Sequence, residues 1–241
     1  MSQGALPAGT RVGRVALAVA DLDRLTDFYA DVVGLAVHDR TGERATLGTA
    51  DGEPLLELHA SDAPERGEEE AGLFHAAFRV PDRAALGAAL ERAEERWRLA
   101  SASDHGVSEA IYLRDPEGNG IEVYYDTPRE AWTELADGRL DIGSWPLDLD
   151  AVRSASDGTA TVPAGSDVGH VNLEVSSVPA AGAFYRDTLG FRVRGSSEGD
   201  AGTLGAVESR LREAGHAVGT DGGTLTVGDP DDIELRIRAQ T

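Results

Sequence analysis

The sequence predicts an α+β protein built from βαβββ units, with a shortened second half. Two observations predict this fold class. Residues 12–37 align without a gap with residues 168–193, which indicates an internal repeat. In each copy, a segment in which every second residue is apolar precedes a segment with apolar residues at helical spacing. A half-buried strand followed by an amphipathic helix is therefore expected twice.

The first copy of the repeat opens the first expected βαβββ unit. Val15, Leu17 and Val19 alternate as in a half-buried strand. Asp21 is the expected N-cap of the following helix, and Gly34 is the expected stop. Three further strands are expected near residues 35–38, 44–48 and 55–59. They complete the first unit, and an acidic loop follows at residues 62–70.

A second, weaker unit begins at Leu73. We expect a strand over 74–80 and a helix over 83–98 that Asp82 caps. Two more strands, 110–113 and 120–125, flank the Asp-Pro-Glu-Gly-Asn-Gly turn at 115–120, whose proline and glycines favour a tight reversal. The first half of the chain thus contains two units.

The second half is shorter. Arg14 to Glu122 spans 108 positions, whereas His170 to Glu234, which we take as their equivalents, spans 64, a deficit of 44. The missing stretch falls after Arg194, where the chain runs directly toward an expected helix over 203–214. We therefore predict a first domain over 10–126, a linker over 127–165 with a short helix near 147–153, and a truncated second domain over 166–238.

The charge of the chain excludes two classes of partner. It has 43 acidic and 22 basic residues, all of the latter arginine, for a net charge of −21. Binding to nucleic acid or to an anionic membrane depends on Lys and Arg near phosphates, so neither partner is expected. Acidic, lysine-free composition also resembles that of proteins adapted to molar salt, in which surface repulsion is screened. We predict a halophilic protein.

Cysteine is absent and Met1 is the only methionine, so a metal site would have to use histidine and carboxylate ligands. The first dozen residues lack the basic start and apolar run of a signal peptide. We expect a soluble cytoplasmic protein.

Four segments carry a resemblance to a known family: GRVALAVADLDRLTDFYADVVGL, SDHGVSEAIYLRDPEGNGIEVYYDTPREAW, PLDLDAV and GHVNLEVSSVPAAGAFYRDTLGF. Together they resemble the vicinal oxygen chelate superfamily of glyoxalases, bleomycin resistance proteins and extradiol dioxygenases, and within it the two-domain catechol-2,3-dioxygenase-like proteins. The resemblance implies that paired units curl their mixed sheets into a cup. It also implies a divalent metal on two histidines, each from the first strand of a unit, and a glutamate from the last strand.

Carried onto the first half, the ligand positions fall on Arg14, His75 and Glu122. Arginine has no lone pair to offer a metal, so this set is incomplete. His105 and Tyr112 match the positions of an acid/base histidine and of a tyrosine that binds substrate.

In the second half, the ligand positions fall on His170, on the deleted segment and on Glu234. His216 is an alternative for the missing ligand, although a histidine at a helix end is also favoured by the helix dipole.

Every candidate also has an ordinary structural interpretation. Histidines and glutamates on strands are often hydrogen-bonded or face solvent, a tyrosine often only packs, and a loop histidine often pairs with a neighbouring aspartate. These alternatives apply to His75, Glu122, His170, Glu234, Tyr112 and His105.

The leading functional hypothesis is an Fe(II)-dependent extradiol dioxygenase, with Mn or Zn as other metals and a small aromatic or vicinal-oxygen compound as substrate. One alternative is a metal-deficient binding or structural module in which Arg14 pairs with Glu122. Another is a glyoxalase-like isomerase or transferase. The truncated half would expose a sheet edge, so we also expect a homo-oligomer.

Overall fold

The computed structural model describes residues 6, 9–63, 67, 70–136, 138, 140–191, 211–221 and 224–238. They form two compact units. The larger unit comprises Val12–Arg66 and Leu73–Asn172, and the smaller unit comprises Met1–Arg11, Gly67–Gly72 and Leu173–Thr241. Among the residues described, none of the helices has the length and apolar character needed to cross a lipid bilayer.

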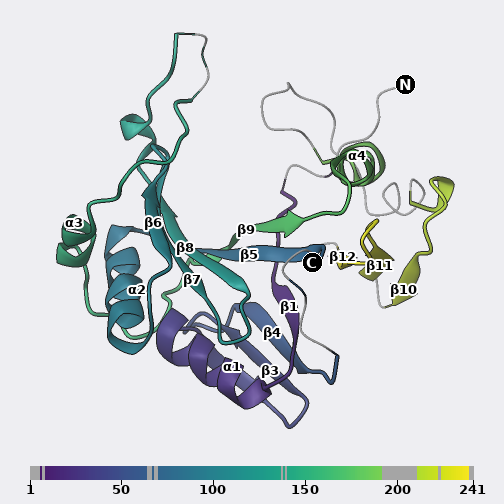
Figure 1. Ribbon diagram of the computed structural model, residues 1–241, viewed down its shortest axis with the longest axis horizontal. Coiled ribbons are helices and arrows are strands. Elements are labelled where there is room, and N and C mark those ends of the chain that lie inside the picture. The colour runs from purple at the N-terminus through teal and green to yellow at the C-terminus, as the bar shows by residue number, and fades with distance from the viewer. Residues whose placement is uncertain are drawn as a thin grey trace. The chain divides into compact units, whose positions relative to one another are not determined.

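The first βαβββ motif of the larger unit follows the predicted order (Figure 1). As predicted, the Asp21 carboxylate caps the first helix by accepting from Arg24 N, and Gly34 ends the helical segment with φ +91°. In the sheet, β1 runs parallel to β4, and the order is β1-β4-β3-β2. The elements are β1 (Val15–Val19), α1 (Leu22–Phe28), the π-helical turn η1 (Tyr29–Val33), β2 (Ala36–Arg40), β3 (Arg44–Gly48) and β4 (Pro54–Ala60).

The second motif repeats this arrangement and gains one strand. Its sheet has the order β6-β7-β8-β5-β9, so β9, from the second copy of the sequence repeat, lies beside β5. Asp82 caps α2 as predicted. The elements are β5 (Gly72–Arg79), α2 (Arg83–Arg96), β6 (Ser101–Asp104), β7 (Ser108–Arg114), β8 (Gly120–Asp126) and β9 (Asp167–Glu174).

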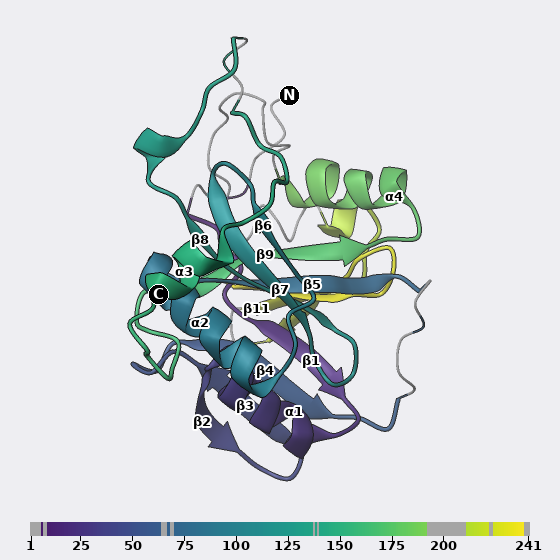
Figure 2. The ribbon, with the colours of Figure 1, turned by 60° about the vertical axis from the view of Figure 1, so that its left-hand side comes forward.

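The main core of the larger unit packs the helices α1 and α2 against its sheets, and a smaller apolar cluster contains Ala77, Ala110 and Tyr124. Figure 2 shows the ribbon of these helices and sheets from a second direction. The fully buried side chains of the main core include Leu25, Tyr29, Phe78, Leu90 and Ile111. The segment between β8 and β9 contains a 3-10 turn, η2 (Arg129–Ala131), and α3 (Leu149–Ser154), which lies against α2. Part of the predicted linker is therefore packed onto the larger unit.

The smaller unit contains the helical part of the second repeat copy and adds an antiparallel sheet of order β10-β11-β12. Gly190 ends its helical segment at φ +88°, as Gly34 does in the first copy. The predicted helix over 203–214 lies largely outside the described residues. The elements are α4 (Val178–Gly182), the π-helical segment η3 (Ala183–Leu189), β10 (Gly219–Asp221), β11 (Thr224–Gly228) and β12 (Glu234–Arg238). The predicted α+β class with mixed sheets is confirmed, whereas the division at 126 and 166 stays a prediction.

Candidate metal centre

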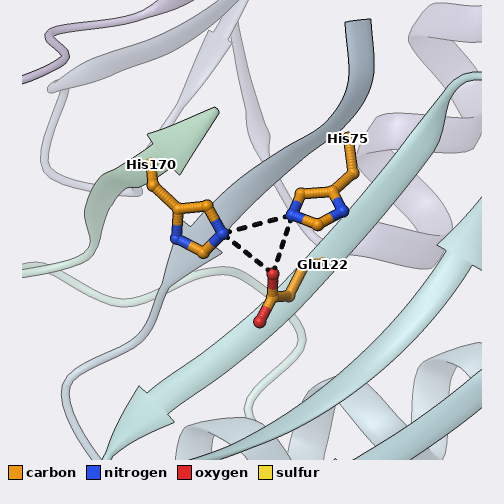
Figure 3. A group of neighbouring side chains, drawn as sticks. All are labelled: His75, Glu122 and His170. Carbon is orange, nitrogen blue, oxygen red and sulfur yellow. Dashed lines mark hydrogen bonds and ion pairs between the residues drawn. The ribbon is translucent and has the colours of Figure 1, made fainter. Parts of the chain in front are cut away.

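Three strands of the larger unit bring His75, Glu122 and His170 to one point (Figure 3). In the parallel pair of β5 and β8, Glu122 lies opposite Ala77, two residues after His75. Because side chains on a strand alternate between faces, His75 and Glu122 share one face of the sheet. The third residue, His170, comes from β9 on the other side of β5.

The three side chains form a nearly equilateral triangle of ligand atoms. Oε2 of Glu122 lies 3.1 Å from Nε2 of His75 and 3.1 Å from Nε2 of His170. The two imidazole nitrogens are also 3.1 Å apart. The side chains of His75 and Glu122 are 10% and 5% exposed, whereas that of His170 is 45% exposed.

This donor set fits a divalent transition metal. For bonds of about 2.1 Å, two ligand atoms at right angles around an ion lie roughly 3 Å apart, which is the separation found here. Two imidazoles and one carboxylate on one side of an ion form the facial triad of non-haem Fe(II) sites, which leaves other positions open. His75, Glu122 and His170 are thus the residues able to hold such an ion.

The electrostatics of Glu122 suit a ligand. Burial, the largest single effect, would raise its pKa, but the hydrogen bonds and the charges of His170 and His75 together outweigh burial and lower the pKa to about 2. The carboxylate is therefore ionised throughout the neutral range, as a metal ligand must be.

A short hydrogen-bonded chain leads outward from the triad. Tyr112 is the cross-strand partner of Glu122, and its hydroxyl donates to Glu122 Oε1 over 3.2 Å. His105 Nε2 lies 2.9 Å from the Tyr112 hydroxyl, and His105 Nδ1 lies 2.6 Å from the carbonyl oxygen of Gly143. Burial, followed by the charge of Glu122, raises the pKa of Tyr112, so this phenol keeps its proton. Both residues that the resemblance implied for catalysis are joined to the triad.

Sequence reasoning missed the segment that holds His105. Asp104 and Trp145 form an isolated β-bridge, with hydrogen bonds in both directions of 3.0 and 2.9 Å. This bridge places the carbonyl oxygen of Gly143 within hydrogen-bond distance of His105 Nδ1. A carbonyl only accepts hydrogen bonds, so the contact with Gly143 places a proton on Nδ1 of His105. The segment lies in the predicted linker, whose composition contains no strand signal.

Arg14 belongs to a different cluster from the one expected. Its Nη1 lies 2.9 Å from Oε1 of Glu57, whose side chain is only 10% exposed, so the expected pair of Arg14 with Glu122 is wrong. Glu57 lies opposite Ala16, two residues after Arg14, in the same register that relates Glu122 to His75. In the first motif, an arginine–glutamate ion pair therefore stands where the second motif has two of the three ligands.

The expected pairing of His170 with Glu234 is also corrected, because His170 joins His75 and Glu122 instead. Glu234 lies on β12, opposite Gly228, and accepts a hydrogen bond from Arg236. In the hairpin of β11 and β12, it is Arg236 that stands three pairs from the turn, as Glu122 does in its own hairpin.

His216 is not a member of the triad either. Its ring stacks edge-on against Phe184 with centroids 5.0 Å apart. The group of His75, Glu122 and His170 is the one set of potential metal ligands among the described residues.

Comparison with known proteins finds sequence similarity to the same superfamily that the sequence motifs resemble. Residues 11–123 match the Glyoxalase/Bleomycin resistance protein/Dioxygenase superfamily. A catechol-2,3-dioxygenase from Bacillus subtilis is 37% identical over 197 residues, which are 79% of this chain and 68% of that protein. A biphenyl-2,3-diol 1,2-dioxygenase from Sphingomonas paucimobilis is 29% identical over 196 residues, and the match covers only 56% of its length.

A solved structure shares the fold over nearly the whole chain. The cppA protein of Streptococcus pneumoniae matches with a TM-score of 0.55 over 92% of this chain and 94% of its own, at 8% identity. Together with the matches in sequence, the mixed sheets of paired βαβββ motifs assign this chain to the glyoxalase, bleomycin resistance protein and dioxygenase superfamily, also called the vicinal oxygen chelate superfamily.

Proposed function

We propose that this protein is an Fe(II)-dependent extradiol dioxygenase, which opens an aromatic ring next to a pair of adjacent hydroxyl groups. The observation that carries the proposal is the triangle of His75, Glu122 and His170, with ligand atoms 3.1 Å apart. The similarity to a catechol-2,3-dioxygenase supports the same substrate class.

The reaction class follows from the donor set. A facial set of three ligands leaves neighbouring positions for two adjacent substrate oxygens and for O2, and Fe(II) bound there would supply the redox chemistry toward oxygen. Extradiol cleavage breaks the carbon–carbon bond beside the diol, and both atoms of O2 enter the product. It therefore needs no further reductant.

The residues of the chain handle protons in this proposal. His105 keeps a proton on Nδ1 through Gly143 and presents Nε2 toward the Tyr112 hydroxyl. With Nε2 unprotonated, this imidazole serves as a general base for a diol hydroxyl. Once protonated, Nε2 donates to the Tyr112 oxygen, whose own hydrogen is donated to Glu122, and the proton is returned later. Tyr112, whose pKa is raised, serves as a hydrogen-bond donor rather than as a phenolate.

The test is metal loading followed by turnover. Metal-free protein is loaded with Fe(II) without oxygen, and bound iron per chain is measured. Catechol and oxygen are then added, and oxygen uptake and the coloured ring-opened product are followed. We expect one iron per chain and product in the wild type, and loss of both in His75→Ala and Glu122→Ala. His38→Gln is the matched control, because His38 lies on the edge strand β2 of the other sheet, where its Nε2 is 2.8 Å from the Thr49 carbonyl oxygen.

Two outcomes would contradict the proposal. Stoichiometric metal without oxygen-dependent turnover of any diol would favour an isomerase or transferase of the same superfamily. Failure of the wild type to bind Fe(II), Mn(II) or Zn(II) would favour a binding module.

A further inference from the structure

We propose that Arg79 is a positioning residue that anchors β9 to β5 and β8 and thereby sets the position of His170 in the triad. The inference rests on the proposed metal site and adds a residue to it.

The guanidinium of Arg79 joins the same three strands that carry the ligands. Arg79 ends β5, and its Nε and Nη2 donate to the two carboxylate oxygens of Asp167 over 3.0 and 2.6 Å. Its Nη1 donates to Asp126 over 3.0 Å. Asp167 is the first residue of β9, and Asp126 is the last residue of β8. Hydrogen bonds with Asp167 are the main reason why the pKa of Arg79 is raised.

The anchor lies close to the triad on every strand. Arg79 follows His75 by four residues on β5, and Asp126 follows Glu122 by four residues on β8. Asp167 precedes His170 by three residues on β9. Because Asp167 and His170 lie on the same strand only three residues apart, a displacement of β9 at Asp167 would also move His170.

Between the anchor and the triad, β9 lies directly on Tyr124. A Cβ atom at Gly169 would lie 1.9 Å from the Tyr124 hydroxyl oxygen, so this approach requires glycine. The Tyr124 ring is 5.5 Å from the ring of His170. Contact with Tyr124 sets how near β9 can come, and the Arg79–Asp167 pair holds it there.

His170 depends on such an anchor more than the other ligands do. Its side chain is 45% exposed, against 10% for His75 and 5% for Glu122, so packing alone constrains it least. A bidentate arginine–carboxylate pair adds direction as well as attraction. Removal of a group that hydrogen-bonds a ligand directly typically lowers metal affinity by about 10- to 100-fold. Arg79 acts through the strand rather than on the ligand itself, so we expect an effect near the lower end of that range.

The test compares Arg79→Gln with a matched control elsewhere in the larger unit. Arg153 has the same pattern of contacts: Nε and Nη2 donate to Glu94, and Nη1 donates to Asp150. Its side chain is 39% exposed, close to the 42% of Arg79. Affinity for Co(II) is measured by visible absorption at fixed salt. We expect Arg79→Gln to bind at least about tenfold more weakly than the wild type, and Arg153→Gln to bind like the wild type.

A double-mutant cycle shows whether Arg79 acts through His170. In a His170→Ala background, Arg79→Gln should cause no further loss of Co(II) affinity, because the ligand that it positions is gone. An equal loss in both backgrounds would overturn the inference, as would unchanged affinity in Arg79→Gln alone. Gly169→Ala should mimic Arg79→Gln by pushing β9 away from Tyr124.

A measurement without metal separates this inference from the proposed function. The imidazole NMR signals of His170, assigned by their absence in His170→Ala, report its contact with Glu122. We expect them to shift toward the values of a free histidine in Arg79→Gln but not in Arg153→Gln. If the wild type binds no metal and this shift is still seen, the proposed function fails while the anchoring role stands. An unchanged His170 signal would refute the anchor itself.

Discussion

Tyr112 donates a hydrogen bond to Oε1 of Glu122, while both imidazoles of the triad contact Oε2. The two oxygens of the Glu122 carboxylate thus make different contacts. Oε2 faces the candidate metal position, and Oε1 connects it to the outer chain of Tyr112 and His105. Removal of the Tyr112 hydroxyl should therefore change the centre without removing a ligand.

We predict that Tyr112→Phe weakens metal binding by about tenfold and slows turnover, because Glu122 loses the hydrogen bond that orients it. The free energy of unfolding should fall by only about 1 kcal/mol, the usual net value of one hydrogen bond. Metal titration and chemical denaturation of the same samples measure the two effects.

Tyr125→Phe is the control for this change. Tyr125 is the cross-strand partner of Glu109, but it belongs to the core on the other face of the sheet. Equal losses of metal affinity in the two variants would show that the Tyr112 hydroxyl has no special part in the centre.

A second prediction concerns alkaline pH. The chain has five tyrosines, and burial is the leading cause of a raised pKa at each of them: Tyr29, Tyr112, Tyr124, Tyr125 and Tyr185. For Tyr124 the pKa is raised to about 12. The folded protein therefore keeps phenol protons that the unfolded chain releases near pH 10.

This difference in pKa makes the free energy of unfolding fall at alkaline pH. The contribution to stability is fully present below pH 10 and is lost as the pH rises from 10 toward 12, because the unfolded chain then binds fewer protons. We expect tyrosinate absorbance to rise steeply together with unfolding. The chain contains no lysine, so no lysine titrates in this window. A gradual rise near pH 10 in still-folded protein would contradict the prediction.

A third prediction separates Arg14 from the metal centre. Arg14→Ala leaves the carboxylate of Glu57 nearly buried without its arginine, which should lower the free energy of unfolding by about 1–2 kcal/mol, since the arginine itself is partly exposed. Bound metal per chain should not change. Arg44→Ala is the control, because its ion pair with Asp39 is half exposed and should contribute less than about 0.5 kcal/mol. Loss of metal in Arg14→Ala would place Arg14 in the centre after all.

A fourth prediction concerns salt. With a net charge of −21, the folded chain repels itself, and the Debye length falls from about 10 Å at 0.1 M salt to about 3 Å at 1 M. The thermal midpoint should therefore rise with KCl and with NaCl alike. Sucrose at matched osmolality, which does not screen charge, is the control. An equal midpoint in dilute buffer and in molar salt would show that repulsion does not limit stability.

Local signals in the sequence were enough to predict most elements of the larger unit. The strand expected at 44–48 is β3, and the caps at Asp21 and Asp82 lie where they were expected. The strand β6, with the sequence SASD, was missed because it has no apolar alternation. Pairing with β7 and with Trp145 holds it in place instead.

Which three residues form the triad could not be predicted, because it depends on contacts between segments that are far apart in the sequence. Nothing near His170 indicates that β9 lies beside β5 rather than serving only the second half, because strand order is decided by packing between distant segments. The mistake at Glu234 has a similar origin. The turns at Asp115 and Asp229 are equally long, so the hairpin register matches Glu122 with Arg236. Alignment by the Ile-Glu motif instead matches Glu122 with Glu234, which lies two residues closer to its turn.

The origin of the ligands on β5, β8 and β9 has a consequence for folding. The three residues are spaced almost evenly along the chain, so an ion held by them would act as a noncovalent cross-link that closes two long loops at once. Such closure restricts the unfolded chain, and the binding free energy of the ion becomes part of the free energy of folding. A chelator would then loosen the attachment of β9 to β5 and β8, in addition to stopping any chemistry.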